Sequence, residues 1–268
     1  MKIKNYSVKY WTSLDPESIA LLSDLHLSSY TTPSKENDIV ESLEKINPSH
    51  IVIAGGLYDG TDEELFENEA AYKYFLRYLK EVSEIAPIYF TLSGSEIFPA
   101  NNEHLYKKNV CSFDAYLRFK KFISDLKANE IRCYLLGQQA DIATRKDGEI
   151  TFSGLNIDSS FFTLDSDEAR NVLLQYEKYL YLVVKKLNKE KFNVLVLHDP
   201  LIFKSVKNIG LLTKFDLVLG GTSRISQASK LQNVRLYPES FKKKYTVGYT
   251  NIIACPEEKL GNVRVRKR

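Results

Sequence analysis

Three side chains that suit metal chemistry follow runs of residues that predict buried strands. Asp24 and His26 stand two residues apart at the end of the apolar run 18–23, and His198 follows the run 193–197. In α/β proteins, ligands collect at the carboxyl ends of the strands, so side chains at these positions are candidates for one site. Carboxylate and imidazole both suit Mn, Fe or Zn. Asp24, His26 and His198 are therefore candidate residues of one functional site.

Five predicted strand ends carry the short polar or glycine-rich runs in which such chemistry would be placed. In chain order these runs are Ser23-Asp24-Leu25-His26, Gly55-Gly56-Leu57-Tyr58-Asp59, Ser93-Gly94-Ser95-Glu96, His198-Asp199-Pro200 and Gly220-Gly221-Thr222-Ser223-Arg224. The chain has no GxGxxG or GxxxxGK[ST] phosphate loop, no GxSxG elbow and no HExxH motif. The sequence therefore gives no support to the common nucleotide-binding, serine-hydrolase or zinc-protease sites.

In order and spacing these runs resemble the calcineurin-like metallophosphoesterase family, in particular its small bacterial members. The family pattern is DxH, GDxxD, GNH followed by Asp or Glu, a lone His and GHxH, each at the end of a core strand. The resemblance extends from about residue 18 to the C-terminus. It implies an α/β fold of four layers, α/β/β/α, with two mixed sheets inside and helices outside. It also implies a centre in which two divalent ions, about 3.5–4 Å apart, activate a water and hold phosphoryl oxygens.

Most of the functional positions of that pattern carry other residues in this chain. Gly56 stands where the resemblance implies the carboxylate that bridges the two metals, and Ser95 stands where it implies the His that assists the leaving group. The remaining replaced metal-ligand positions are Gly94, Thr222 and Arg224.

The number of histidines also indicates that metal ligands of the family pattern are missing. The intact pattern needs five, and the chain has four. His50 begins the strand predicted at 50–54, at the end opposite to the motif loops, and His104 lies in a polar loop. Neither is placed to substitute for a lost ligand. We therefore expect no two-metal centre and assign no catalytic residue.

The positions that remain have two interpretations. Asp24, His26 and His198 either hold one Mn, Fe or Zn ion weakly or form a remnant held by hydrogen bonds. We prefer the remnant, because a pair of ligands with a distant third is a poor site when catalytic zinc uses three protein ligands and structural zinc four. Asp59 and Glu96 lie next to the metal ligands in the family pattern and are expected to bond the loop backbone rather than a metal.

Arg224 is the replacement with a chemistry of its own. Its guanidinium is always charged and has no acceptor, so it cannot ligate a metal. We expect it to occupy the space of the first metal and to pair with Asp24. The alternative is that it points to solvent.

The sequence thus predicts a metallophosphoesterase-like protein that has lost most of its metal ligands, a catalytically inactive pseudoenzyme acting as a binding or regulatory module. Its partner would be a protein or an anionic small molecule at the former active-site cleft, and no cofactor is expected. The alternative is a residual or altered one-metal phosphoesterase, hydrolysing phosphodiesters or phosphomonoesters with Asp24, His26 and His198.

The composition is that of a globular protein. The 268 residues are 44% hydrophobic and 26% charged, and no linker or repeat divides them, so we expect residues 1–268 to form one domain. The longest apolar run, 179–184, is far shorter than the roughly 20 residues of a membrane span, and the N-terminus lacks a signal-like apolar core, which favours a cytoplasmic location. The net charge of +3, with basic clusters only at 242–244 and 264–268, disfavours a nucleic-acid partner. The three cysteines show no CxxC pairing and are expected to be thiols.

Short strand-like runs alternate with helical periodicity, which predicts an α/β protein. A capping box at Thr61 and Glu64 predicts the start of one long helix that Pro87 closes. Other helices are expected around 39–46, at 113–126 and at 172–187. Strands are expected at 18–23, 50–54, 88–92, 132–136, 141–144, 150–153, 193–197, 215–219, 234–237, 251–254 and 263–266, and near the N-terminus.

Overall fold

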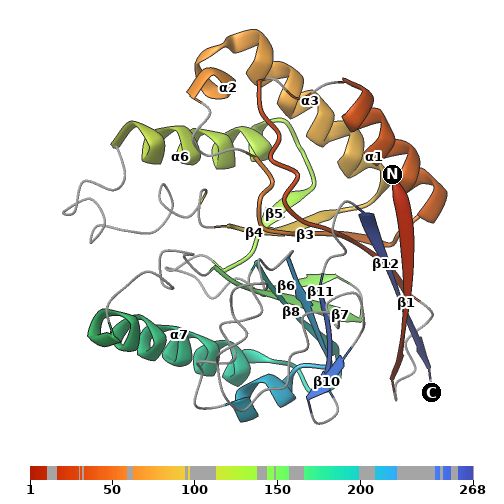
Figure 1. Cartoon of the computed structure of the whole chain (residues 1–268), viewed down its shortest axis with the longest axis vertical. Coiled ribbons are helices and arrows are strands. Elements are labelled where there is room, and N and C mark those ends of the chain that lie inside the picture. The colour runs from red at the N-terminus through yellow and green to blue at the C-terminus, as the bar shows by residue number, and fades with distance from the viewer. Residues whose placement is uncertain are drawn as a thin grey trace.

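The computed structural model contains two six-stranded sheets within the residues that it describes (Figure 1). Those residues are 1–10, 17–29, 31, 33–58, 63–93, 96, 113–137, 144–147, 149–156, 166–198, 209–221, 245–247, 250–254 and 259–267. The order of the first sheet is β1-β12-β2-β3-β4-β5, and that of the second is β10-β11-β9-β8-β7-β6. Strands β2 to β5 run parallel, as do β7, β8, β9 and β11. The α/β prediction is confirmed.

The bounds of the strands are as follows. The first sheet consists of β1 (Lys2–Tyr10), β2 (Glu17–Leu22), β3 (His50–Ala54), β4 (Ile88–Thr91), β5 (Cys133–Leu135) and β12 (Lys259–Lys267). The second sheet consists of β6 (Thr144–Asp147), β7 (Ile150–Leu155), β8 (Phe192–Leu197), β9 (Leu217–Gly220), β10 (Tyr245–Val247) and β11 (Thr250–Ala254). Because parallel strands end at the same edge, the loops after β2, β3 and β4 lie next to one another.

The core strands have apolar residues at consecutive positions because both faces of the sheet are buried there. In β3 every residue is buried, and alternate side chains enter different clusters. Ile51 and Ile53 pack with the helices that cover the first sheet, whereas Val52 and Ala54 pack between the two sheets. The cluster between the sheets draws on strands of both, and one of its contacts is the stacking of Tyr89 on Phe152 at a centroid distance of 4.3 Å.

The helices cover the sheets on their other faces. Helices α1 (Pro33–Ile46), α2 (Glu63–Glu67), α3 (Glu69–Ile85) and α6 (Phe113–Ala128) contribute buried side chains to the cluster on the first sheet. Helix α7 (Ser166–Lys186) lies against the second sheet, where the Tyr179 hydroxyl donates to the carbonyl oxygen of Gly154 at 3.3 Å. The short 3₁₀ helix η3 (Ile209–Lys214) precedes β9. Figure 1 shows α1, α3 and α6 on one side of the pair of sheets and α7 on the other.

The long helix predicted from Thr61 is instead two helices. Thr61 lies outside the described residues, and α2 ends before Asn68. The Asn68 side chain accepts hydrogen bonds from the N–H groups of Ala70 and Ala71, and its own ψ of 105° is extended. An asparagine that caps the second helix in this way also ends the first. The apolar face of α3 packs on the first sheet, since Tyr72, Phe75, Leu79 and Val82 are buried and Leu76 packs beside them.

Most other predicted elements are present, with ends shifted by a few residues. Of the strand expected at 141–144 the structure describes only Thr144, which belongs to β6, and β6 continues to Asp147 opposite β7 in an antiparallel ladder. In this ladder Thr144 pairs with Ser153 and Asp147 pairs with Ile150, so pairing with β7 carries the strand past position 144. The strand expected at 234–237 and residues 141–143 lie outside the described residues. Cys133 is a buried free thiol, as predicted, and burial raises its pKa.

A buried amide joins the two sheets close to the strand ends. The Oδ1 atom of Asn156 accepts from the N–H of Leu92 at 2.8 Å. Its Nδ2 atom donates to the carbonyl oxygens of Leu136 and Gly137, at 3.0 and 2.7 Å. Asn156 follows β7, whereas its three partners follow β4 and β5, so one side chain satisfies backbone groups that the end of the first sheet leaves unpaired.

Replacing Asn156 by Asp tests this tie. The carboxylate keeps an acceptor for Leu92 but places oxygen opposite two carbonyl oxygens, which loses both donated hydrogen bonds in a buried position. We expect the free energy of unfolding, measured by urea denaturation, to fall by about 2–4 kcal/mol. The carboxyl-to-amide exchange Glu84→Gln, at an exposed position of α3, should change it by less than about 0.5 kcal/mol. Equal losses of stability in the two variants would contradict the role of Asn156 in joining the two sheets.

Within the described residues, no helix is long and apolar enough to cross a bilayer.

Candidate functional site

The loop after β2 lies along the loop after β3, and this contact places Asp24 and His26. Their backbone N–H groups donate to the carbonyl oxygens of Gly55 and Gly56, at 3.0 and 2.8 Å. A parallel bridge at Leu27 continues the pairing. The ladder between β2 and β3 thus extends past the ends of both strands.

Asp24 and His26 both adopt left-handed backbone conformations. Their φ angles are +52° and +45°, in a region where a side chain with a Cβ costs about 1–2 kcal/mol. Strained conformations of this kind persist only where neighbouring structure imposes them, and they cluster at functional sites. Here the hydrogen bonds to Gly55 and Gly56 impose them.

The Asp24 carboxylate lies between two imidazoles. Its Oδ1 atom is 3.6 Å from Nε2 of His26 and 3.7 Å from Nε2 of His198. Its Oδ2 atom accepts a hydrogen bond from the Ser23 hydroxyl at 2.8 Å. The His26 side chain is 50% exposed and that of His198 only 16%. The structure therefore brings together Asp24, His26 and His198, with His26 as the member most open to solvent.

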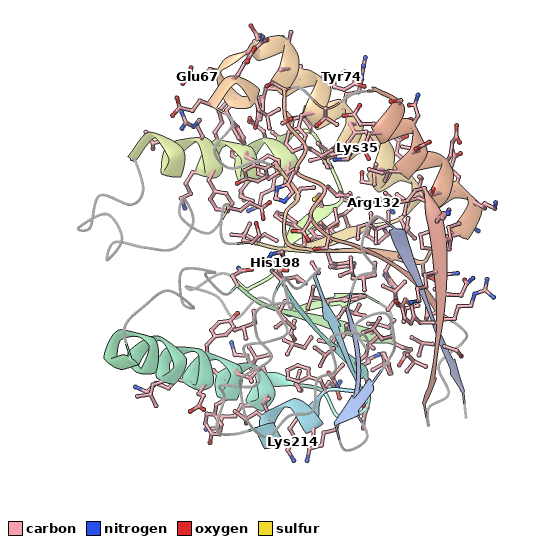
Figure 2. The ribbon with its side chains drawn as sticks, viewed as in Figure 1. Lys35, Glu67, Tyr74, Arg132, His198 and Lys214 are labelled. Atoms are coloured by element: carbon pink, nitrogen blue, oxygen red, sulfur yellow. The ribbon has the colours of Figure 1, made fainter. Side chains whose placement is uncertain are left out.

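The orientation of His198 is set by the backbone around it. Its Nδ1 atom lies 2.9 Å from the carbonyl oxygen of Ala54. Since a carbonyl only accepts, Nδ1 carries the proton and Nε2 faces Asp24. A Cβ atom at Gly55 would lie 2.4 Å from Nδ1, and one at Gly221 would lie 2.7 Å from it. Both glycines are therefore needed for the ring to fit where the two sheets meet (Figure 2).

Position 56 is a glycine, whereas the family pattern has at this position the carboxylate that bridges the two metals. The φ angle of Gly56 is +69°, and a Cβ atom there would lie 2.7 Å from the Cα of Asp24. The N–H of Gly56 donates to the Glu96 carboxylate at 2.8 Å. In this conformation a side chain at position 56 would collide with the loop that carries Asp24.

Glu96 is fully buried and binds the loops around it. Its Oε2 atom accepts from the N–H groups of Gly56 and Ser93 and from the Ser93 hydroxyl, at 2.8, 2.7 and 2.9 Å. Its Oε1 atom accepts from the N–H of Tyr58 at 3.1 Å. Burial raises the pKa of Glu96, and the hydrogen bonds from Ser93, Tyr58 and Gly56 oppose that rise. The carboxylate thereby joins the end of β4 to the loop after β3.

The described residues do not supply the ligands of a two-metal centre. Within the part of the chain that the structure describes, no group of three or more His, Cys, Asp or Glu is arranged to hold a metal ion. Position 56, where the resemblance implies a bridging carboxylate, is a glycine, and a Cβ atom there would lie 2.7 Å from the Cα of Asp24. Oδ1 of Asp24 lies within 4 Å of Nε2 of His26 and of Nε2 of His198.

Several predicted site positions lie outside the described residues. These are Asp59, Gly94, Ser95, Thr222 and Arg224, together with His104. The pairing of Arg224 with Asp24 therefore stays a prediction. His50 lies at the start of β3, at the end opposite to the motif loops, as the sequence indicates.

Sequence reasoning missed three contributors to this site. Ser23 donates to Asp24, Ala54 offers its carbonyl oxygen to His198, and Gly221 makes room for the His198 ring. The signal for Ser23 was available, because a hydroxyl directly before a carboxylate can bond it. The other two depend on contacts between strands far apart in the chain.

No protein-family model and no curated protein matches the sequence of this chain. Among solved structures, one crystal structure aligns with 91% of this chain and 91% of its own length, at 11% identity and a TM-score of 0.51. Phosphopantetheinyl hydrolase (PptH) from Mycobacterium tuberculosis aligns over 88% of this chain and 87% of its own, at 12% identity and a TM-score of 0.42. A dimetal phosphatase from Danio rerio aligns over 90% and 87%, at 11% identity and a TM-score of 0.46. At these identities the likeness concerns the fold alone.

Replacing Glu96 by Gln tests the role of this carboxylate in holding the loops. A Gln offers one oxygen and one NH₂ group, so either the Tyr58 N–H or the N–H groups of Gly56 and Ser93 must face another donor. We expect a loss of about 1–3 kcal/mol in the free energy of unfolding, measured by urea denaturation. Glu84→Gln, at an exposed position of α3, is the matched control, with an expected change within about 0.5 kcal/mol. A Glu96→Gln protein as stable as this control would show that the carboxylate does not hold the loops.

Proposed function

We propose that this chain is a metallophosphoesterase-like protein with a four-layer α/β/β/α arrangement whose former catalytic cleft serves binding or regulation instead of hydrolysis. The observation that carries the proposal is the backbone at Gly56. Two-metal hydrolysis depends on ions held close together by a shared ligand, and at this position a backbone N–H points at Glu96 instead.

The surviving polar groups support a binding role. Asp24 is held by Ser23 and flanked by two imidazoles, and His26 is half exposed. These groups present a carboxylate acceptor and an accessible imidazole at a site whose backbone is held by Glu96. The proposed occupant is a protein segment or an anionic small molecule, which His26 would meet first.

A second candidate is a one-metal phosphoesterase. The observation in its favour is that Oδ1 of Asp24 lies within 4 Å of both Nε2 atoms, and that the Nδ1–H of His198 is bonded to Ala54, which leaves Nε2 available. Carboxylate and imidazole suit Mn, Fe or Zn. A bound ion would act as a Lewis acid, and in that case Asp24, His26 and His198 would hold it.

Metal content and hydrolysis separate the two candidates. Protein purified without chelator should carry well under one Mn, Fe or Zn per chain by elemental analysis. Hydrolysis of bis-p-nitrophenyl phosphate with added Mn should stay at the level of a buffer control, because the metal and general-acid contributions are both lost. One metal per chain together with turnover that disappears in Asp24→Asn would favour the one-metal enzyme. Two metals per chain would contradict both candidates.

Substitutions at Gly56 test whether its backbone conformation excludes a bridging ligand. Gly56→Ala and Gly56→Asp should each lower the free energy of unfolding by about 1–3 kcal/mol, because both put a Cβ at a left-handed φ and against Asp24. Gly56→Asp should leave the metal content at the wild-type level. Thermal denaturation measures the stability of the two variants, and elemental analysis measures their metal content. Gly56→Ala is the control, because it adds the Cβ atom without a carboxylate.

The complete set of replaced positions should behave differently, because metal ligands act together. Recovery of metal is expected only in the combined variant Gly56→Asp, Gly94→Asn, Ser95→His, Thr222→His and Arg224→His, in which binding of the metal by the full ligand set would offset the cost of moving the Asp24 loop. Stoichiometric metal in Gly56→Asp alone would show that position 56 has been misassigned.

A further inference from the structure

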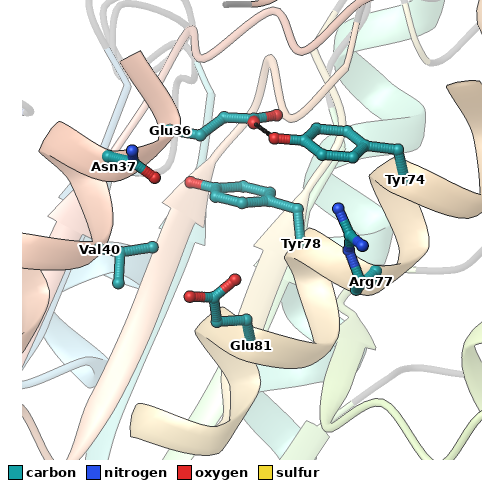
Figure 3. A pocket seen from close by; sticks show the side chains of 7 residues that line it. All are labelled: Glu36, Asn37, Val40, Tyr74, Arg77, Tyr78 and Glu81. Atoms are coloured by element: carbon teal, nitrogen blue, oxygen red, sulfur yellow. Dashed lines mark hydrogen bonds between the residues drawn. The ribbon is translucent and has the colours of Figure 1, made fainter. Parts of the chain in front are cut away.

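A pocket lies between α1 and α3, apart from the strand-end site (Figure 3). It has a volume of about 260 Å³, including the part that is open to solvent. Three residues of α1 and four of α3 line it: Glu36, Asn37, Val40, Tyr74, Arg77, Tyr78 and Glu81.

The pocket holds a buried carboxylate. Glu36 is only 4% exposed, and its Oε2 atom accepts a hydrogen bond from the Tyr74 hydroxyl at 2.5 Å. Burial is the main cause that raises the pKa of Glu36, and the nearby Glu81 raises it further. Arg77 lies over the Tyr74 ring, 4.9 Å from its centroid. The charged groups that line the pocket therefore sum to one net negative charge when both carboxylates are ionised.

Tyr78 supplies a second, independent observation. Its side chain is 5% exposed, and its hydroxyl is buried without a hydrogen-bond partner. Figure 3 shows this hydroxyl directed toward α1, beside Glu36 and Asn37. A buried hydroxyl without a partner costs about 1–3 kcal/mol, so a bound group that reaches it would be stabilised.

We propose that this pocket binds a primary ammonium group carried on a short alkyl chain. An ammonium offers three donors, which match the Glu36 carboxylate, the Tyr78 hydroxyl oxygen and the Asn37 carbonyl oxygen. Its charge compensates the buried Glu36 and the neighbouring Glu81. The Tyr78 ring favours a cation, and Val40 offers a contact for methylene groups.

Other ligand classes fit less well. Two carboxylates against one arginine disfavour an anion. A divalent metal ion is disfavoured because the pocket has only two carboxylates, and across the described chain no group of three or more His, Cys, Asp or Glu is placed to hold one. The ammonium itself has two sources, a free amine or the lysine side chain of a partner polypeptide, and its recognition chemistry is the same for both.

The test uses the full chain and n-butylamine as the probe, with n-butanol as its uncharged counterpart. Titration followed by amide ¹H–¹⁵N NMR should give saturable shifts at Val40 and Arg77 with butylamine and none with butanol. Glu36→Gln, which keeps an acceptor for Tyr74 but removes the charge, should weaken binding about tenfold or more. Glu84→Gln, which removes an exposed carboxylate from the same helix outside the pocket, should bind butylamine like the wild type.

Tyr78→Phe separates a ligand contact from a structural role. Because the hydroxyl has no partner in the free protein, its removal should leave the melting temperature unchanged or raise it, while butylamine binding weakens at least about threefold. Butylamine that binds no better than butanol, or that binds Glu36→Gln and Tyr78→Phe as well as wild type, would overturn the proposal.

Two further probes identify the source of the ammonium. Nα-acetyl-lysine methylamide binding more tightly than butylamine at Val40 and Arg77 would assign the pocket to a lysine of a partner polypeptide. Spermidine binding more tightly than both would assign it to a free polyamine. If neither probe shifts the amide signals of Val40 and Arg77, the proposal is overturned. None of these results tests the function proposed for the strand-end site.

Discussion

One buried carboxylate holds the candidate site together. Glu96 accepts hydrogen bonds from the backbone of the loops after β3 and β4. The loop after β3 in turn accepts the N–H groups of Asp24 and His26. A chain of backbone contacts thus leads from Glu96 to the strained residues after β2. Because a backbone N–H buried without a partner is costly, the position of each loop depends on the one before it.

The second constraint on the site is the close packing of the Gly55 and Gly221 backbone against the His198 ring. His198 reaches Asp24 only because Gly55 and Gly221 have no Cβ atoms where the ring and its carbonyl partner lie. The same lack of a side chain at Gly56 lets the loop of Asp24 approach, and a bridging carboxylate cannot be added there without moving that loop. With the Asp24 loop in this place, position 56 has no room for a side chain. This geometry is the physical basis of the binding role that we propose.

Polar side chains connect the site to the rest of the fold. Asn156 joins the ends of β4 and β5 to the end of β7. The Lys35 ammonium, at the start of α1, donates to the carbonyl oxygen of Leu25, which lies between Asp24 and His26 in the chain. The helix that carries the buried Glu36 is therefore joined to the loop of the candidate site. The pocket between α1 and α3 is thus connected to the strand-end site through the first turn of α1, although their chemistry differs.

The sequence by itself determined the strands, the helical faces and the positions at which site residues follow strands. Runs such as 51–54 and 194–197 are apolar at every position, and burial on both faces of a sheet is the local reason. The break at Asn68 was also a local signal, but the apolar stripe of the longer helix masked it.

Only the tertiary structure decided which groups meet. Glu96 and Gly56 are 40 residues apart, Asn156 and Leu92 are 64 apart, and His198 and Ala54 are 144 apart. These pairs depend on the register of neighbouring strands and on the distance between two sheets, which no local pattern contains. The type of a residue indicates whether it is buried. The hydrogen-bond partner of a buried polar group depends instead on where strands far apart in the chain end.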